Sequence, residues 1–233
     1  MNHTAVLGDR WPASSLLGGL GHATRTAMLA LGRPVRFTGG ERLLHEGDVG
    51  THLYLLLVGW FKVMTVSAGG HETLLAIRVG GDVVGELTVF DERPRTSAVK
   101  AAGPGTARRI EKQEFLAFLT AHGDAVEAVM RAVAGKMRWA TQWRSEFPHC
   151  PVGIRVARVL TEMARVYGQT GDLGVTIGTP FTQPDLAALV GSSVPTVQRV
   201  LRSMREHGMI ETHYRRILVR DVAGLQRAAG TAR

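Results

Sequence analysis

The chain has 233 residues, of which 45% are hydrophobic and 21% charged. This length allows one large domain or two smaller ones with separate cores, and the composition is that of a soluble globular protein. No apolar run reaches the roughly 20 residues that span a bilayer, and the first 20 residues lack a signal-peptide core. We therefore expect a cytoplasmic protein without membrane contact. The single cysteine, Cys150, excludes an internal disulfide and leaves cysteine-ligated zinc and iron–sulfur sites unsupported.

Positive charge is concentrated in the last third of the chain. The formal net charge is +8, from 28 Lys/Arg against 20 Asp/Glu. Residues 150–233 hold 11 Lys/Arg and 6 Asp/Glu, a net +5, which leaves 17 and 14, a net +3, for residues 1–149. A basic final third favours a polyanionic partner such as nucleic acid.

The region from about Val35 to Glu111 has turn residues every 8–12 positions, which is typical of short strands joined by tight turns. Many short strands at this spacing predict a sandwich or small barrel. The expected strands are Val35–Phe37, Arg42–His45, Leu53–Leu57, Phe61–Val66, Leu74–Arg78, Val83–Val84, Val99–Ala101 and Ala107–Ile110. The first 20 residues and the tail after about Gln226 are expected to be poorly anchored.

Within this region, Gly85-Glu86-Leu87 is followed by Arg95-Thr96-Ser97. The glycine allows backbone N–H groups to approach a ligand closely, and arginine binds phosphate with two hydrogen bonds. The carboxylate can accept a hydrogen bond from a sugar hydroxyl. This set of residues suits a small phosphorylated sugar compound, and the alternative is a surface loop with a Glu86–Arg95 ion pair.

A helical period replaces the strand pattern from about Gln113 to Phe147. Val126, Met130, Val133, Met137 and Ala140 recur at steps of four and three, which is a heptad-like seam. Such a seam either pairs with a second copy of the helix or packs on the β-domain. Two prolines, Pro148 and Pro151, then break the helix, so a hinge is expected there.

The last third predicts two short helices joined at a glycine. An amphipathic helix, Ile154–Tyr167, comes first. Thr182 then begins one short helix, and Ser193, just after Gly191, begins a second. The second helix has one apolar face and one polar, basic face, the latter formed by Pro195, Gln198, Arg199, Arg202 and Arg205. Two expected strands, Met209–Thr212 and Ile217–Val219, flank the basic connection 213–216, so the pattern is a winged helix-turn-helix.

These motifs, in this order over roughly residues 30–225, resemble the cyclic AMP receptor protein/FNR (CRP/FNR) family of bacterial transcription regulators. The resemblance implies an α+β protein with an N-terminal jelly-roll-like β-roll (residues 1–122) and a long dimerisation helix (123–147). A hinge (148–152) and a C-terminal winged helix-turn-helix (153–233) follow. The expected partners are double-stranded DNA and a second copy of the chain, with RNA polymerase left open as a third.

The resemblance also assigns ligand-binding residues. Arg95 and Thr96 would hold a cyclic phosphate, with Ser97 beside them, and Glu86 would hold the ribose hydroxyl. Gly85 and Leu87 would shape the loop, and Thr141 would bond the base. Ala140, beside Thr141, cannot form such a bond, so cyclic AMP, cyclic GMP, another effector or none remain open.

The DNA-binding residues implied by the resemblance lie on both short helices and the wing. They are Thr182, Gln183, Ser193, Val194, Thr196, Gln198, Arg199, Arg202, Arg215 and Arg216. Many family members have Arg-Glu where this chain has Val194-Pro195, which offer no side-chain hydrogen bond to a base. Arg199 can bond guanine and Gln198 can reach adenine, while Arg202 and Arg205 are expected to contact phosphates.

Two other functions compete with a cyclic-nucleotide-controlled regulator. One is a DNA-binding regulator of the same fold without this effector. The other, remote, is a cupin-like metal enzyme, since β-rolls of this size can hold metals. His45, His52 and His71 lack the His-x-His spacing of such sites, so we expect no metal site, no catalytic residues and no enzyme.

Overall fold

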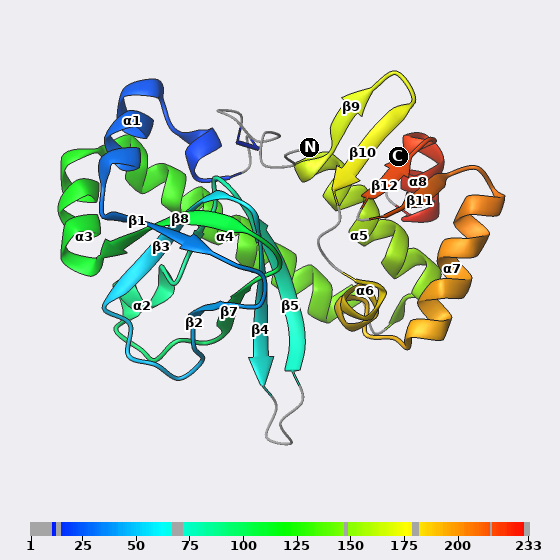
Figure 1. Cartoon of the computed structure of the whole chain (residues 1–233), viewed down its shortest axis with the longest axis horizontal. Coiled ribbons are helices and arrows are strands. Elements are labelled where there is room, and N and C mark those ends of the chain that lie inside the picture. Colours follow the sequence, from blue (N-terminus) through cyan, green and yellow to red (C-terminus); the bar gives the residue numbers. More distant parts are fainter. Residues whose placement is uncertain are drawn as a thin grey trace. The chain divides into compact units, whose positions relative to one another are not determined.

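A computed structural model describes residues 11–12, 15–66, 72–146, 149–178, 182–214 and 216–230 (Figure 1). The chain divides into two compact units, Met1–Met137 and Arg138–Arg233. The division falls within a single long helix, α4 (Gly123–Glu146). No helix in the described ranges is long and apolar enough to cross a membrane.

The first unit contains two four-stranded antiparallel sheets. The first sheet has the order β1-β8-β3-β6, from β1 (Arg33–Phe37), β8 (Gly105–Glu111), β3 (His52–Val58) and β6 (Val83–Val84). The second has the order β2-β7-β4-β5, from β2 (Arg42–Leu44), β7 (Ala98–Ala101), β4 (Trp60–Val66) and β5 (Glu72–Val79). All eight expected strands form, with ends that differ by at most two residues. The predicted β-roll is therefore confirmed.

Each face of the first sheet contributes to a core. On one face, Tyr54 and Phe37 join Phe61 of the second sheet, with edge-to-face ring contacts at 5.7 and 6.2 Å between centroids. On the other face, Leu53 and Ile110 are buried beneath three helices. These helices are α1 (His22–Ala30), α3 (Lys112–Ala121) and the first half of α4. The alternation of side chains along β3 thus serves two cores at once.

The expectation of poorly anchored ends is wrong where the structure describes them. Leu16, Leu17 and Leu20 are buried in the helical core, and the Leu17 N–H donates to the Gly81 carbonyl at 3.0 Å. At the other end, α8 (Val222–Ala228) docks on α5, and Arg158 Nε donates to the carbonyl of buried Ala229 at 2.9 Å. The described part of each end is held by a few buried apolar side chains and by hydrogen bonds to the backbone, and these are too few to show as a periodic pattern in the sequence.

The stretch with a helical period forms two helices, and the second agrees with the long helix expected over residues 123–147. α3 ends before His122, which has extended backbone angles, and α4 begins at Gly123. The break turns the chain so that Phe115 on α3 and Ala125 on α4 enter the same core. The heptad-like pattern lies entirely on α4.

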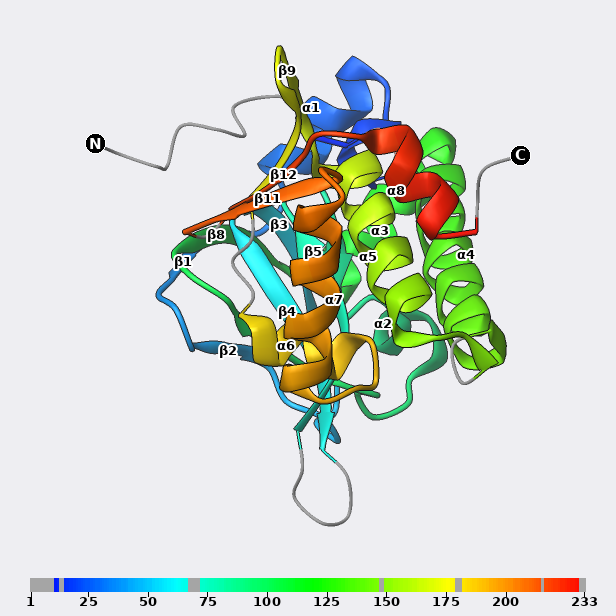
Figure 2. The same cartoon turned by 90° about the vertical axis from the view of Figure 1, so that its right-hand side faces the viewer.

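The second unit packs helices on a four-stranded sheet of order β11-β12-β10-β9. α5 (Val152–Tyr167) contacts both α7 (Val194–Glu206) and α8, as Figure 2 shows. The strands are β9 (Gln169–Gly171), β10 (Gly174–Gly178), β11 (Ile210–His213) and β12 (Arg216–Val219). The β9–β10 hairpin was not expected, since its glycine-rich sequence carries little strand signal. β10 pairs with β12 and so extends the predicted wing.

Gly174 should be essential to this extension. Its φ is +127°, and a Cβ there would lie 2.2 Å from the Val219 carbonyl oxygen. We expect Gly174→Ala to lower the free energy of unfolding by about 1–3 kcal/mol, measured by denaturant titration. Gly171→Ala, at the exposed end of β9 and without a close neighbour, is the matched control. Equal losses in the two variants would contradict this account.

Candidate functional sites

The Gly85-Glu86-Leu87 motif forms a tight turn from β6 into the short helix α2 (Leu87–Asp91). Gly85 has a φ of +83°, and a Cβ at this position would lie 2.5 Å from Arg95 Nη1 and 2.9 Å from Leu44. The Thr88 hydroxyl donates to the Gly85 carbonyl at 3.0 Å and closes the turn. Only glycine therefore lets the guanidinium of Arg95 lie directly against this backbone.

Arg95 is held inside the β-roll with only 5% of its surface exposed. Its Nη2 donates to the His52 carbonyl at 2.7 Å, and its backbone N–H donates to the Asp48 carbonyl at 2.9 Å. Its Nη1 is buried and has no hydrogen-bond partner. Burial lowers the pKa of Arg95, and the nearby Asp48 opposes this effect. A buried charged donor without an acceptor is costly, and a bound anion would satisfy it.

Glu86 is also buried, with 4% of its surface exposed. Its Oε1 lies 2.9 Å from Lys136 Nζ on α4, and the same ammonium donates to the Val83 carbonyl at 2.6 Å. Glu86 thus pairs with Lys136 instead of forming the Glu86–Arg95 ion pair of the alternative interpretation. Sequence reasoning missed Lys136, because no local spacing connects it with a carboxylate 50 residues earlier.

The other predicted ligand residues surround this pair unevenly. Leu87 is exposed on α2, Thr96 is exposed, and Ser97 is half-buried just before β7. Thr141 is exposed on α4 and belongs to the second compact unit, so its contact with a base stays a prediction. The structure therefore brings Gly85, Glu86 and Arg95 together at the start of α2.

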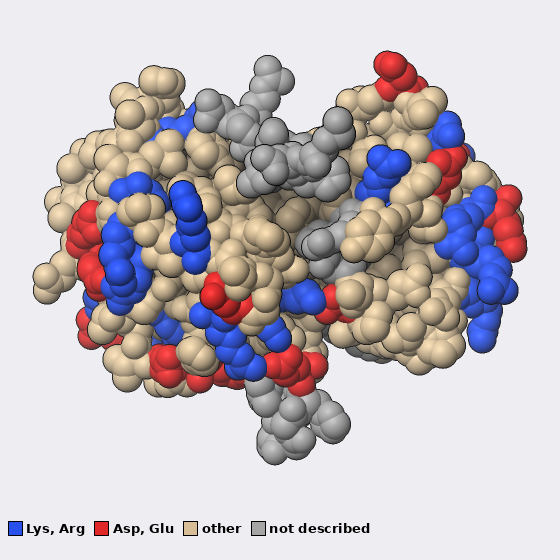
Figure 3. Space-filling view, in the orientation of Figure 1, with Lys and Arg blue, Asp and Glu red and all other residues tan. Residues whose placement is uncertain are grey.

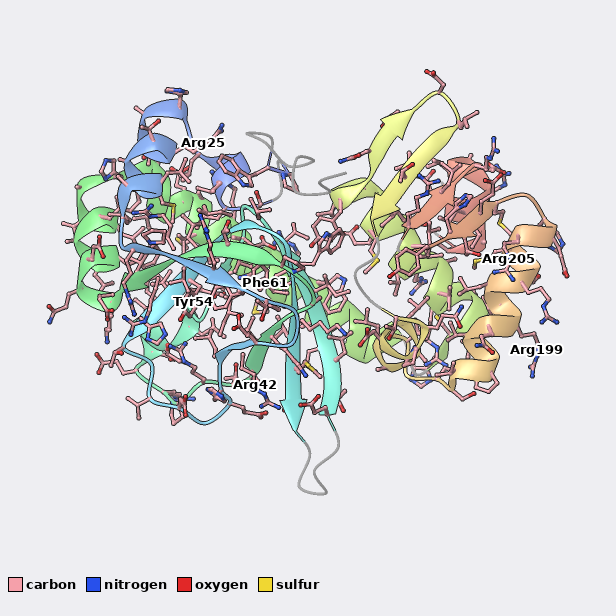
Figure 4. The ribbon with its side chains drawn as sticks, viewed as in Figure 1. Arg25, Arg42, Tyr54, Phe61, Arg199 and Arg205 are labelled. Atoms are coloured by element: carbon pink, nitrogen blue, oxygen red, sulfur yellow. The ribbon has the colours of Figure 1, made fainter. Side chains whose placement is uncertain are left out.

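His52 supports the Arg95 guanidinium from the first sheet. Its carbonyl accepts from Arg95, and its Nδ1 lies 3.0 Å from Arg109 Nη2. Its ring also meets Tyr54, labelled in Figure 4, edge to face. Burial, reinforced by Arg109 and Arg95, lowers the pKa of His52 from 6.5 to about 4. The imidazole is therefore neutral near pH 7 and can accept a hydrogen bond from Arg109.

No cluster of three or more His, Cys, Asp or Glu side chains in the described residues is placed to hold a metal ion. His45 lies 3.6 Å from Asp48, and His52 contacts Arg109 as above. His71 lies outside the described residues.

In the second unit, the two predicted short helices form with the predicted caps. Thr182 and Asp185 make a reciprocal capping box at the start of α6 (Gln183–Leu189). The Ser193 hydroxyl accepts from the Thr196 N–H at the start of α7. Between the helices, Gly191 has a φ of +57°, and Arg155 Nη1 on α5 donates to the Val190 carbonyl at 2.6 Å. These contacts fix the angle between α6 and α7 by hydrogen bonds to the backbone.

α7 has the two faces that its sequence predicts. Val197, Leu201 and Met204 are buried against the unit. The opposite side chains are exposed, and Figure 4 shows Arg199 and Arg205 extending outward from α7. Figure 3 shows basic side chains gathered over this helix. Arg205 also donates to Thr212 on β11 at 3.1 Å, so it joins α7 to the wing.

The wing lies between β11 and β12. Tyr214 at its tip is 90% exposed, and Arg216 is exposed next to it, while Arg215 lies outside the described residues. Glu211 pairs with Arg220 at 2.7 Å and with His213 at 3.2 Å, and these contacts lower the pKa of its carboxyl. In the described part of the wing, Arg216 is an exposed arginine that takes part in neither of these ion pairs.

Comparison with known proteins matches each compact unit to a domain family. The cyclic nucleotide-binding domain family matches residues 34–122, and the Crp-like helix-turn-helix domain family matches residues 154–228. The chain belongs to the CRP/FNR family. A CRP-like cAMP-activated global transcriptional regulator of Mycobacterium tuberculosis is 28% identical over 197 residues, covering 84% of this chain and 88% of the relative.

Solved structures of other bacterial proteins share the fold. FixK2 from Bradyrhizobium japonicum has a TM-score of 0.76 at 19% identity, covering 87% of this chain and all of that one. The c-di-GMP responsive global regulator CLP of Xanthomonas campestris has a TM-score of 0.68 at 18% identity, covering 86% and 100%. The helix-turn-helix domain family and the Mycobacterium relative, rather than these structures, show that the protein is a DNA-binding transcription regulator, and they indicate a family of regulators rather than of enzymes.

The low pKa of His52 makes stability depend on pH. Between about pH 4 and 6.5 the unfolded chain binds a proton at His52 that the folded protein does not. The free energy of unfolding therefore decreases as the pH falls through this range. We expect His52→Gln, which retains an acceptor for Arg109, to show a smaller drop in melting temperature between about pH 7 and pH 4.5. His22→Gln on α1 is the control, and identical pH profiles for wild type and His52→Gln would refute the assignment.

Proposed function

We propose that this CRP/FNR regulator is controlled by a cyclic nucleotide bound at the Gly85–Arg95 cassette. The observation that carries the proposal is the buried Arg95 Nη1, which has no hydrogen-bond partner and lies against the Gly85 backbone. A cyclic phosphate supplies a compact anionic acceptor for such a group. Thr96 and Ser97 follow Arg95 directly and can donate hydroxyl hydrogen bonds to the same phosphate.

The pairing of Glu86 with Lys136 offers a route from ligand to helix. Lys136 lies on α4 and holds both Glu86 and the end of β6. A ribose hydroxyl that bonds Glu86 would compete with Lys136 for the carboxylate, and a phosphate nearby would attract the same ammonium. Ligand binding therefore changes the contacts of α4. It shifts a conformational equilibrium to the extent that the two states differ in these contacts.

Homodimerisation through α4 is the second part of the proposal. Ala125, Ala128 and Val129 face the core of the first unit. The seam residues Met130 and Met137 are each 66% exposed, and Val126 and Ala140 are exposed as well. Val133, in the middle of the seam, packs partly against the core of the first unit. The other seam residues are left exposed by the described part of the chain, and they form an apolar stripe that fits the same stripe of a second copy.

DNA recognition by α7 completes the proposal. Thr182, Ser193 and Thr196 lie at the capped helix starts and would contact phosphates, together with Arg202 and the wing residues Arg215 and Arg216. Val194 can touch a thymine methyl group, and Arg199 can bond guanine O6 and N7. A two-fold dimer would place two such helices on half-sites about 34 Å apart, one turn of the duplex.

Calorimetric titration with cyclic AMP and cyclic GMP tests the ligand. We expect saturable binding that Arg95→Ala weakens at least about tenfold, because each hydrogen bond to a charged group contributes roughly 1.5–3 kcal/mol. Arg42→Ala, which removes a surface arginine paired with Glu72, is the matched control. Absence of binding by both nucleotides would refute control by them, and c-di-GMP, the effector named for the Xanthomonas relative, would then be titrated.

Base reading by Arg199 is tested on duplexes selected by the wild-type protein. Arg199→Ala should weaken binding to the selected duplex by about 1–3 kcal/mol and leave random duplex nearly unaffected. Arg202→Ala should weaken binding to both duplexes equally, since phosphates carry no sequence information. If Arg199→Ala also weakens both equally, Arg199 is a phosphate contact and guanine reading at this position is excluded.

A further inference from the structure

A hydrogen bond between two glutamine side chains joins the helices of the DNA-binding unit. Gln198 Nε2 on α7 donates to Gln183 Oε1 at the start of α6 over 2.8 Å. Both side chains are exposed. An exposed hydrogen bond of this kind contributes little to folding, since water would serve either amide as well. The main effect of this hydrogen bond is on which amide atoms the pair presents to a binding partner.

We propose that Gln183 is a positioning residue that orients Gln198, and that the oriented amide selects an adenine in each DNA half-site. This inference rests on the proposed sequence reading by α7 and adds a specific base and a second residue to it. Gln183 alone would be expected only to touch a phosphate, and Gln198 alone would be free to rotate.

The two helix starts that carry the pair are themselves fixed. Thr182, the residue before Gln183, is held in the capping box with Asp185. The start of α7 is held by the Ser193–Thr196 contacts, at 2.9 Å between the hydroxyls. Arg155 secures the turn between the helices. The distance between the two glutamine backbones is thus set by the fold, and the pair needs no DNA to form.

The pair leaves a defined set of hydrogen-bonding atoms. With one Nε2 hydrogen bound to Gln183, Gln198 keeps a second N–H donor and its Oε1 acceptor. The major-groove edge of adenine offers the complementary set, the N7 acceptor and the N6 amino donor. Guanine offers two acceptors, so it would place its O6 against Oε1. Gln183 keeps two N–H donors, which suit a phosphate oxygen.

Orientation is the contribution of Gln183. A glutamine amide can turn over about its last torsion and exchange its donor and acceptor ends. With Gln183 Oε1 as its acceptor, the nitrogen of Gln198 is held on that side, and the reversed orientation would require both amides to turn over together. The orientation of Gln198 matters because Val194 and Pro195, in the first turn of α7, have no side-chain group that can form a hydrogen bond with a base. Base selection at this end of the helix then depends on Gln198 and its neighbour Arg199.

The test is a selection from a randomised duplex pool by the full-length protein, with and without cyclic AMP, followed by affinity measurements on the enriched duplex. We expect one adenine per half-site whose replacement weakens wild-type binding about 5- to 100-fold. Gln198→Ala should abolish that preference. Gln183→Met, which has similar length but no acceptor, should reduce it at least about threefold. Gln183→Glu, which keeps an acceptor, should retain it although the added negative charge weakens binding to every duplex.

Gln226→Met on α8 is the matched control and should change neither affinity nor preference. Melting temperatures of the Gln198→Ala and Gln183→Met variants should match the wild type, since both side chains are exposed. An adenine preference that survives in Gln183→Met would overturn the positioning role. A guanine preference lost in the same variants would overturn the adenine assignment and indicate the reversed pair. If the wild-type protein enriches no sequence, the proposed sequence recognition by α7 is refuted, and so is the adenine preference that depends on it.

Discussion

The buried guanidinium of Arg95 is the constraint around which the β-roll is arranged. A cation inside a protein needs acceptors on every side. The His52 carbonyl serves Nη2, while the backbone of Arg95 exchanges hydrogen bonds with Gly47 and Asp48. Gly85 is a glycine because Nη1 occupies the space of a Cβ. One nitrogen is left unsatisfied. The unpaired Nη1 lowers the stability of the ligand-free fold. Destabilising features of this kind are typical of binding sites, where a ligand supplies the missing partner.

The strands were predictable because each carries its own alternation and its own turn residues, and these signals are local. The helix-turn-helix was predictable for the same reason, since Thr182, Gly191 and Ser193 act on their neighbours in sequence. The β9–β10 hairpin was not predicted because its stability comes from the pairing of β10 with β12. At the Val175–Val219 pair the two residues are 44 positions apart in the sequence. The burial of the leucines in the N-terminal segment was not predicted because they pack against helices that are distant in sequence and form no periodic pattern of their own.

The candidate site divides in the same way. Gly85, Glu86 and Arg95 were found because chemistry and spacing coincide within eleven residues. Lys136 was not, because its link to Glu86 exists only after α4 has packed beside the cassette. The bond between Gln183 and Gln198 belongs to the same class, for it depends on the angle between two helices. Contacts of this kind form between elements, and a reading of single elements cannot reveal them.

Helix α4 shows how ligand binding and assembly could be coupled without a dedicated relay. One of its faces completes the core of the first unit, a second carries Met130 and Met137 outward, and Lys136 lies between them in sequence and holds Glu86. A helix is stiff along its axis, so a change of contacts that displaced the backbone at Lys136 would also displace the methionines on either side. If a ligand binds at the cassette as proposed, it would in that way alter the geometry of the outward seam. Because the free energy of such coupling is shared by both processes, assembly through the seam would in turn alter ligand affinity.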